Sequence, residues 1–179
     1  MTSAQVSKSI KRHSLELTLS EKLVHYEPCI LCLGIFLCLL GLFVFVSEIK
    51  DVLIDDFLWL YWFFGGIGSA LYFCQRSRLK LRRFKTRLPY KLIIDVIAQL
   101  SIQQDWQVVE VGTNFIIVKS GFSFSHNSWG ERMTILFDKN LLFVNSINDP
   151  NKRASLTKGR NKENIEAIIK EIQRTENLI

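Results

Sequence analysis

The chain has 179 residues, of which 48% are hydrophobic, and a formal net charge of +6. The chain contains two long apolar stretches that are each expected to form a helix. If the protein were a soluble all-α protein, the remaining hydrophobic residues would be too few to bury two helices that are apolar on all sides. The charge excess lies between residues 75 and 91, and the rest of the predicted cytoplasmic domain is balanced, ten basic against ten acidic residues. That balance counts against dedicated nucleic-acid recognition, and direct nucleic-acid binding is not predicted.

Residues 1–28 are predicted to form an N-terminal cytoplasmic or interfacial segment. Ser20 can cap a short helix that leads to Pro28, where the chain enters the membrane. The segment either lies on the cytoplasmic leaflet or packs as an arm on a neighbour. A short strand is also possible, because three leucines alternate along it: Leu15, Leu17 and Leu19.

Two apolar runs, Cys29 to Val46 and Phe57 to Cys74, each contain 18 residues without a charged side chain. As a helix, each run rises roughly 27 Å, close to the ~30 Å hydrocarbon thickness of a bilayer. Residues 29–74 are therefore predicted to be a two-helix transmembrane hairpin. A cleavable signal peptide is not expected, because the first run follows 28 mixed residues and a second run comes soon after it.

Both runs contain several small residues, and small residues allow helices to approach each other closely in lipid. The membrane-packing or oligomer residues predicted from this pattern are Gly34, Gly41, Gly65, Gly66, Gly68, Ser69 and Ala70. We favour packing within one hairpin over packing between subunits, although both can hold. Neither run contains an ionisable acid, His, Lys or Arg, so a proton relay or a coupled-transporter site is poorly supported.

Residues 75–91 form a predicted basic juxtamembrane collar with a net charge of +8. Its members are Arg76, Arg78, Lys80, Arg82, Arg83, Lys85, Arg87 and Lys91. Basic residues beside a span stay on the cytoplasmic side, so we expect a bacterial inner-membrane protein with both termini in the cytoplasm. The collar is predicted to bind anionic lipid headgroups. The two alternatives are that it forms a charged ring at a pore mouth, or that it is a docking site for RNA or DNA.

Residues 92–179 are predicted to be a small cytoplasmic α+β domain. An apolar stripe after Pro89 predicts a helix that ends before Gln103. Four β-rich segments follow, namely Trp106 to Val111, Asn114 to Lys119, Met133 to Phe137 and Leu141 to Ser146. Asn161 can cap a final helix. The predicted fold class is thus an α+β membrane protein whose four-stranded antiparallel sheet is flanked by helices on one face.

Two long connections stand out in this domain. The first is an aromatic loop between Gly121 and Arg132, which needs a partner for its apolar side chains and carries Phe122, Phe124, His126 and Trp129. The second connection, from Asn148, precedes the last helix and could hold an anion or a partner, although a solvated turn is favoured. Its candidate residues are Lys152, Arg153, Lys158, Arg160 and Asn161.

No cofactor and no metal site is predicted. His126 has no Cys, Asp or Glu at a metal-ligand spacing beside it. Cys29 and Cys32 match a redox or zinc half-site in spacing only, and their place at the start of a span makes them small packing residues.

The layout of a basic-collared membrane hairpin followed by a small cytoplasmic domain resembles the small membrane accessory proteins of type VI-B CRISPR loci. That resemblance implies an oligomeric membrane pore that strengthens RNA-guided antiviral defence, with a functional link to an RNA-guided nuclease. Members have been discussed as divergent HEPN ribonucleases. Arg160 and Asn161 would begin the HEPN signature, but its His is replaced by Ile165, Glu166 or Ala167. A general base is therefore missing, and no enzyme activity is predicted.

The leading hypothesis from the sequence is a non-enzymatic homo-oligomer that forms or gates a pore in the inner membrane. The alternative is a membrane-tethered binding module, an immunity or scaffold protein, that grips a soluble partner through its cytoplasmic domain.

Overall fold

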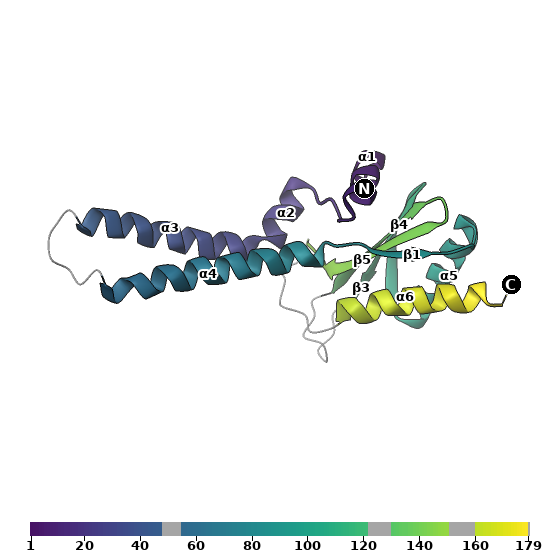
Figure 1. Ribbon diagram of the computed structural model, residues 1–179. Coiled ribbons are helices and arrows are strands. Elements are labelled where there is room, and N and C mark those ends of the chain that lie inside the picture. The colour runs from purple at the N-terminus through teal and green to yellow at the C-terminus, as the bar shows by residue number, and fades with distance from the viewer. Residues whose placement is uncertain (48–54, 122–129, 151–159, 179) are drawn as a thin grey trace. The chain divides into compact units, whose positions relative to one another are not determined.

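The computed structural model describes residues 1–47, 55–121, 130–150 and 160–178 (Figure 1). Within these residues the protein contains six helices and five strands, in an α+β arrangement. The chain divides into two compact units. The first, here called the helical unit, is His25–Ser77, and the second, the sheet domain, combines Met1–Val24 with Arg78–Ile179.

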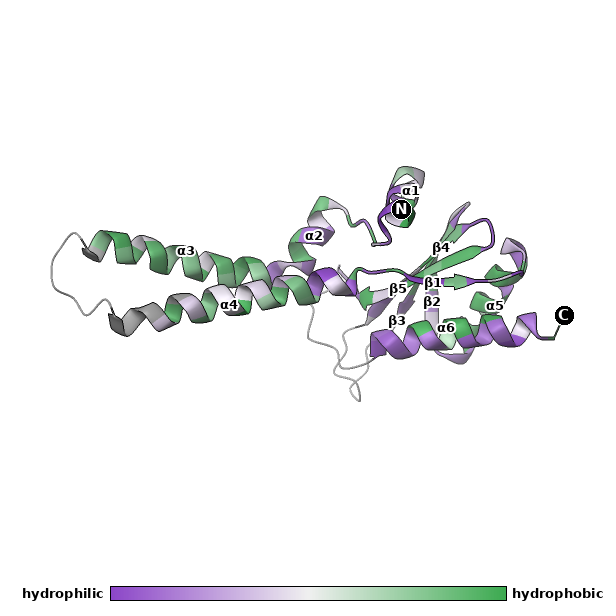
Figure 2. Ribbon diagram, viewed as in Figure 1, coloured by the Kyte–Doolittle hydropathy of each residue, from purple (hydrophilic) through white to green (hydrophobic). Residues whose placement is uncertain are grey.

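The helical unit consists of α3 (Glu27–Ser47) and α4 (Asp55–Arg78), which run side by side (Figure 1). The helix α3 is hydrophobic along most of its length, whereas α4 is mixed and ends in polar residues next to the sheet domain in the sequence (Figure 2). Many of their large apolar side chains are exposed, for example Leu31 at 65% and Phe45 at 64%. Among the described residues, one helix is long and apolar enough to cross a membrane, over Glu27–Phe45. The predicted transmembrane pair is therefore not confirmed, and it stays a prediction.

The sheet domain is built on five antiparallel strands in the order β1-β5-β4-β3-β2. The bounds are β1 (Arg82–Lys85), β2 (Trp106–Val111), β3 (Phe115–Ser120), β4 (Glu131–Asp138) and β5 (Leu141–Asn148). The prediction of four strands is wrong, because β1 pairs along β5, with Arg82 opposite Val144 and Lys85 opposite Leu141. Three of its four residues are basic, so the composition concealed an edge strand.

Helices α5 (Tyr90–Gln103) and α6 (Arg160–Glu176) cover one face of this sheet (Figure 1). Ile97 and Ile168 are at most 1% exposed and pack in one cluster with strand residues such as Met133. Each fully buried side chain of this kind contributes about 1.5–3 kcal/mol relative to an exposed one. The predicted stripes of the two helices therefore form the main core.

The opposite face of the sheet is covered by the N-terminal segment. This segment contains α1 (Ser3–Arg12) and α2 (Leu19–His25), and an extended stretch between them. Val6, Leu15 and Leu17 are 4%, 4% and 2% exposed. On β5 the side chain of Phe143, which points away from the main core by strand alternation, lies 5.9 Å from the His13 ring.

Two backbone hydrogen bonds join this extended stretch to the chain that enters β1. Leu15 N donates to Leu79 O at 2.8 Å, and Leu81 N donates to His13 O at 3.0 Å. The expectation of an interfacial segment or an arm on a neighbour is therefore corrected: residues 1–24 belong to the sheet domain. The expectation that helices cover one face is corrected with it, because the alternating apolar residues of β4 and β5 need a cover on both faces.

Candidate functional site

Two of the predicted small residues bring α4 close to α3. A Cβ atom at Gly68 would lie 3.3 Å from Cys32 Cβ, and one at Gly65 would lie 3.6 Å from the Phe36 ring. Ser69 Oγ donates to the Gly65 carbonyl at 2.8 Å and so stays on its own helix. Gly65 and Gly68 therefore form the seam between the two helices.

The other glycines of the helical unit point elsewhere. A Cβ atom at Gly34, Gly41 or Gly66 would meet nothing within 4 Å. At 3.6 residues per turn, Gly34 and Gly41 share one side of α3, and Cys32 and Phe36 lie on the opposite side. The glycines of α3 thus face away from α4, so the predicted seam between two small-residue faces is not formed within one chain. Gly66 and the exposed Ala70 are also turned outward.

The end of the helical unit where α3 begins and α4 ends is here called its base. Polar and aromatic contacts that the sequence analysis missed hold the two helices together at this base. His25 and Gln75 are 8% and 6% exposed, and His25 Nε2 donates to the Gln75 carbonyl at 3.0 Å. The Tyr26 and Tyr72 rings stack with their centroids 5.6 Å apart. His25 and Tyr26 come just before the first apolar run, and Tyr72 and Gln75 lie at the end of the second. Two antiparallel helices would bring these positions together, and this is the sequence signal that could have predicted the contacts.

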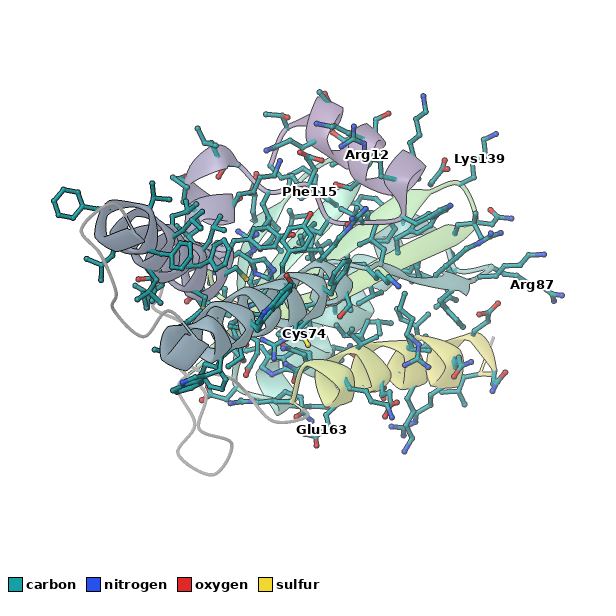
Figure 3. All side chains as sticks on the ribbon, turned by 60° about the vertical axis from the view of Figure 1, so that its left-hand side comes forward. Arg12, Cys74, Arg87, Phe115, Lys139 and Glu163 are labelled. Atoms are coloured by element: carbon teal, nitrogen blue, oxygen red, sulfur yellow. The ribbon has the colours of Figure 1, made fainter. Side chains whose placement is uncertain are left out.

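The basic collar is not a linker, because it extends from the end of α4 through β1 to the start of α5. Arg76 and Arg78 close α4, while Arg82, Arg83 and Lys85 lie on β1. Arg82 Nη1 lies 3.6 Å from a Glu166 carboxylate oxygen, and both side chains are about half exposed. The remaining collar residues, Lys80, Arg87 and Lys91, are exposed, and Arg87 projects from the domain just beyond β1 (Figure 3). The collar therefore supplies an accessible cationic sheet edge.

The described part of the predicted anion loop makes internal contacts. The helix α6 begins at Arg160, so Asn161 lies in the first turn and the prediction that it caps the helix is wrong. Arg160 Nε lies 3.3 Å from Glu131 Oε2, and Glu131 is fully buried and also accepts from Ser120 Oγ. Asn161 Oδ1 accepts from Ser146 Oγ at 2.9 Å. These contacts anchor α6 to the sheet.

The other residues of the two predicted loops lie outside the described residues. For the aromatic loop these are Phe122, Phe124, His126 and Trp129, and for the anion loop Lys152, Arg153 and Lys158.

Two more ion pairs bury charge in the sheet domain, and the sequence analysis missed both. Arg132, 8% exposed on β4, pairs with Glu21 of α2, and Lys119 Nζ lies 2.8 Å from Asp149 Oδ2. Burial raises the pKa of the Glu21 carboxyl, but hydrogen bonds from Arg132 and Thr18 lower it more, so the net pKa lies below its ordinary value. The sequence signal that could have predicted these pairs is a charged residue, such as Arg132, within the apolar pattern of a buried strand.

Two contacts hold the residues of the sheet domain that come just before and just after the helical unit in the sequence. Glu21 pairs with Arg132 and holds α2 on β4, and Asn145 Nδ2 donates to the carbonyls of Arg78 and Lys80 at 2.8 and 2.9 Å.

Within the residues that the structure describes, no group of three His, Cys, Asp or Glu side chains could hold a metal ion, and the cysteines Cys29, Cys32, Cys38 and Cys74 are free thiols.

Comparison of the chain with protein-family models, with curated proteins and with solved structures found no match.

Proposed function

We propose that the protein is a non-enzymatic membrane protein of the bacterial inner membrane that self-associates through α3 and α4 to form or gate a pore. The observation that carries this proposal is the outward face of small residues at Gly34, Gly41 and Gly66, where a Cβ atom would meet nothing within 4 Å. In lipid, helices associate by close packing at small residues rather than by the hydrophobic effect. An open small-residue face on each helix supports contacts between copies of the chain.

Exposed apolar side chains support the membrane location. Almost none of the Glu27–Phe45 helix is buried inside the protein, and exposed leucines line it. Covering such a surface with lipid avoids the cost of hydrating it. The cationic stretch that begins at Arg76 places its side of the membrane in the cytoplasm by the positive-inside rule.

Two helices cannot enclose a water-filled path, so conduction requires several copies around an axis. The predicted spans contain no Asp, Glu, His, Lys or Arg, and a pore lined by them would close through an apolar constriction that excludes water. Depolarisation in antiviral defence, linked to an RNA-guided nuclease, is the role that the family resemblance implies, and it stays a prediction.

Substitution of the outward glycines tests this proposal. The double variant Gly34→Leu and Gly41→Leu adds bulk to the outward face of α3 without touching α4, so the oligomer should dissociate and liposome conductance should fall to background. The control Leu42→Phe enlarges a 59% exposed residue on the flank of the same helix and should preserve both. Native mass spectrometry gives the subunit number, and liposome flux gives the conductance. A wild-type monomer, or an oligomer without conductance, would refute the pore.

The alternative is a membrane-tethered binding module, and β2, which is an edge strand of the sheet within the described residues, favours it. Five of the six residues of β2 are exposed, and Val108, Val109 and Val111 are 37%, 49% and 50% exposed. An unpaired apolar edge can accept a strand from a soluble partner. The variant Val109→Lys would then abolish capture of that partner by the full-length protein and leave the oligomer intact.

A further inference from the structure

An apolar groove of about 490 Å³ lies between α3 and α4, in the half of the helical unit next to its base. Ile30, Leu33 and Phe36 line it from α3, and Phe64, Tyr72 and Phe73 line it from α4. Its volume falls in the range of about 300–1,000 Å³ that is usual for small-ligand sites. Gly65 and Gly68 also line the groove, at the level where α4 approaches Cys32 and Phe36 of α3.

The base end of the groove combines aromatic hydroxyls with a cation. Tyr26 and Tyr72, whose rings stack, line this end. Burial raises the pKa of the Tyr26 hydroxyl, and the positive charge of Arg76 acts on the same hydroxyl in the opposite direction. Arg76 follows Tyr72 by one helical turn and is exposed, so its guanidinium is available next to the mouth. The exposed carboxylate of Glu27 and the buried His25 belong to the same end.

We propose that this groove binds one acyl chain of an anionic phospholipid of the cytoplasmic leaflet, with the phosphate held by Arg76 and the tyrosine hydroxyls. The inference rests on the membrane location in the proposed function, and it does not depend on pore formation. An apolar cleft that opens at a cationic, hydroxyl-bearing end matches the two parts of such a lipid. The collar continues beyond Arg76 with Arg78 and Lys80, which outnumber Glu27 and attract an anionic headgroup.

A second copy of the chain is a poorer occupant for the groove. Close helix contacts require small residues at the approaching surface. The rim of this groove carries bulky rings instead, and Phe73 is 65% exposed. The outward faces of Gly34 and Gly66 are the sites where another backbone can approach.

Photocrosslinking of the full-length protein in nanodiscs tests the proposal. The probes are phosphatidylglycerol and phosphatidylcholine with the same photoactivatable acyl chain, each added to an otherwise equal bilayer. We expect phosphatidylglycerol to label peptides that contain Leu33 and Phe73, in preference to phosphatidylcholine. The variant Ile30→Trp enlarges a half-exposed side chain that lines the groove and should lose this labelling, whereas the matched control Leu31→Trp makes a similar enlargement at a 65% exposed position outside the lining and should keep it.

A second variant addresses the headgroup without changing the packing of the groove. Arg76→Gln should reduce the preference for phosphatidylglycerol about fivefold, since one basic residue near a charged leaflet contributes about 1 kcal/mol. The charge-matched control Arg174→Gln, on α6 and outside the collar, removes one charge from a side chain that is 70% exposed and should leave the preference unchanged. Equal labelling by the two lipids, labelling unaffected by Ile30→Trp, or crosslinks at the groove between two copies would each overturn the proposal. Loss of conductance in Gly34→Leu with labelling retained would separate the two proposals.

Discussion

Removing Leu15 or Leu17 from the second face of the sheet should cost the protein much of its stability. The two side chains are 4% and 2% exposed, although the segment that carries them lies outside the region predicted to fold. Truncation of a fully buried Leu to Ala costs about 2–5 kcal/mol, because transfer energy is lost and a cavity remains. A domain of this size has roughly 5–15 kcal/mol of stability in total.

The single variants Leu15→Ala and Leu17→Ala should therefore open β4 and β5 to solvent, and the double variant should approach complete unfolding of the sheet domain. Leu19→Ala is the matched control: this residue is 76% exposed, so its truncation should change stability by about 0.5 kcal/mol or less. Hydrogen–deuterium exchange of the full-length protein in detergent measures the protection of the β4 and β5 peptides.

A fragment of residues 92–179 extends the same test. It lacks both β1 and the N-terminal cover, so it should expose one face and one edge of the sheet and aggregate. A fusion of residues 1–24 to 78–179 restores both and should be soluble and cooperative. Equal exchange in Leu17→Ala and Leu19→Ala, or a well-folded fragment 92–179, would refute the role assigned to the N-terminal segment.

Further predictions concern the tight turn and the buried charges. In Gly112→Ala the new Cβ would overlap the ring of Phe115, which is buried, so the ring or the β2–β3 turn must shift and the melting temperature should fall by several degrees. At Gly121 a new Cβ would meet nothing within 4 Å among the described residues, so Gly121→Ala should not change the melting temperature. The lowered pKa of Glu21 means that its pair with Arg132 stabilises the protein above the ordinary carboxyl value of 4.5, and that this stabilisation is lost as the pH falls through the lower folded value. Glu21→Gln should be less stable at neutral pH and should show a smaller loss on acidification; a parallel pH profile would contradict this assignment.

Local sequence patterns were sufficient to predict the helices and strands in which buried apolar residues recur every few positions. The apolar runs predict α3 and α4, the stripe through Ile93 and Ile97 predicts α5, and alternation predicts β2 to β5 within a few residues. These signals arise because a helix or a strand turns its own neighbouring residues toward one core. The predicted α+β class is confirmed for the same reason.

Local patterns could not predict contacts between segments that are far apart in the sequence, such as strand pairs and buried ion pairs. The strand β1 is mostly basic and forms because β5 offers a free edge, about 60 residues away in the sequence. The buried Arg132 pairs with Glu21, and the buried Glu131 pairs with Arg160 and accepts from Ser120, so both charges are stabilised by residues of other elements.

The sequence alone determined that there are two apolar helices, that a cationic stretch follows them, and that a mixed α and β domain comes last. Only the tertiary structure decided that residues 1–24 complete that domain, and that Gly65 and Gly68 face α3 while Gly34 and Gly41 face away. The physical reason is that periodicity reports which side of an element is apolar or small, whereas the surface that meets this side depends on the packing of the whole chain.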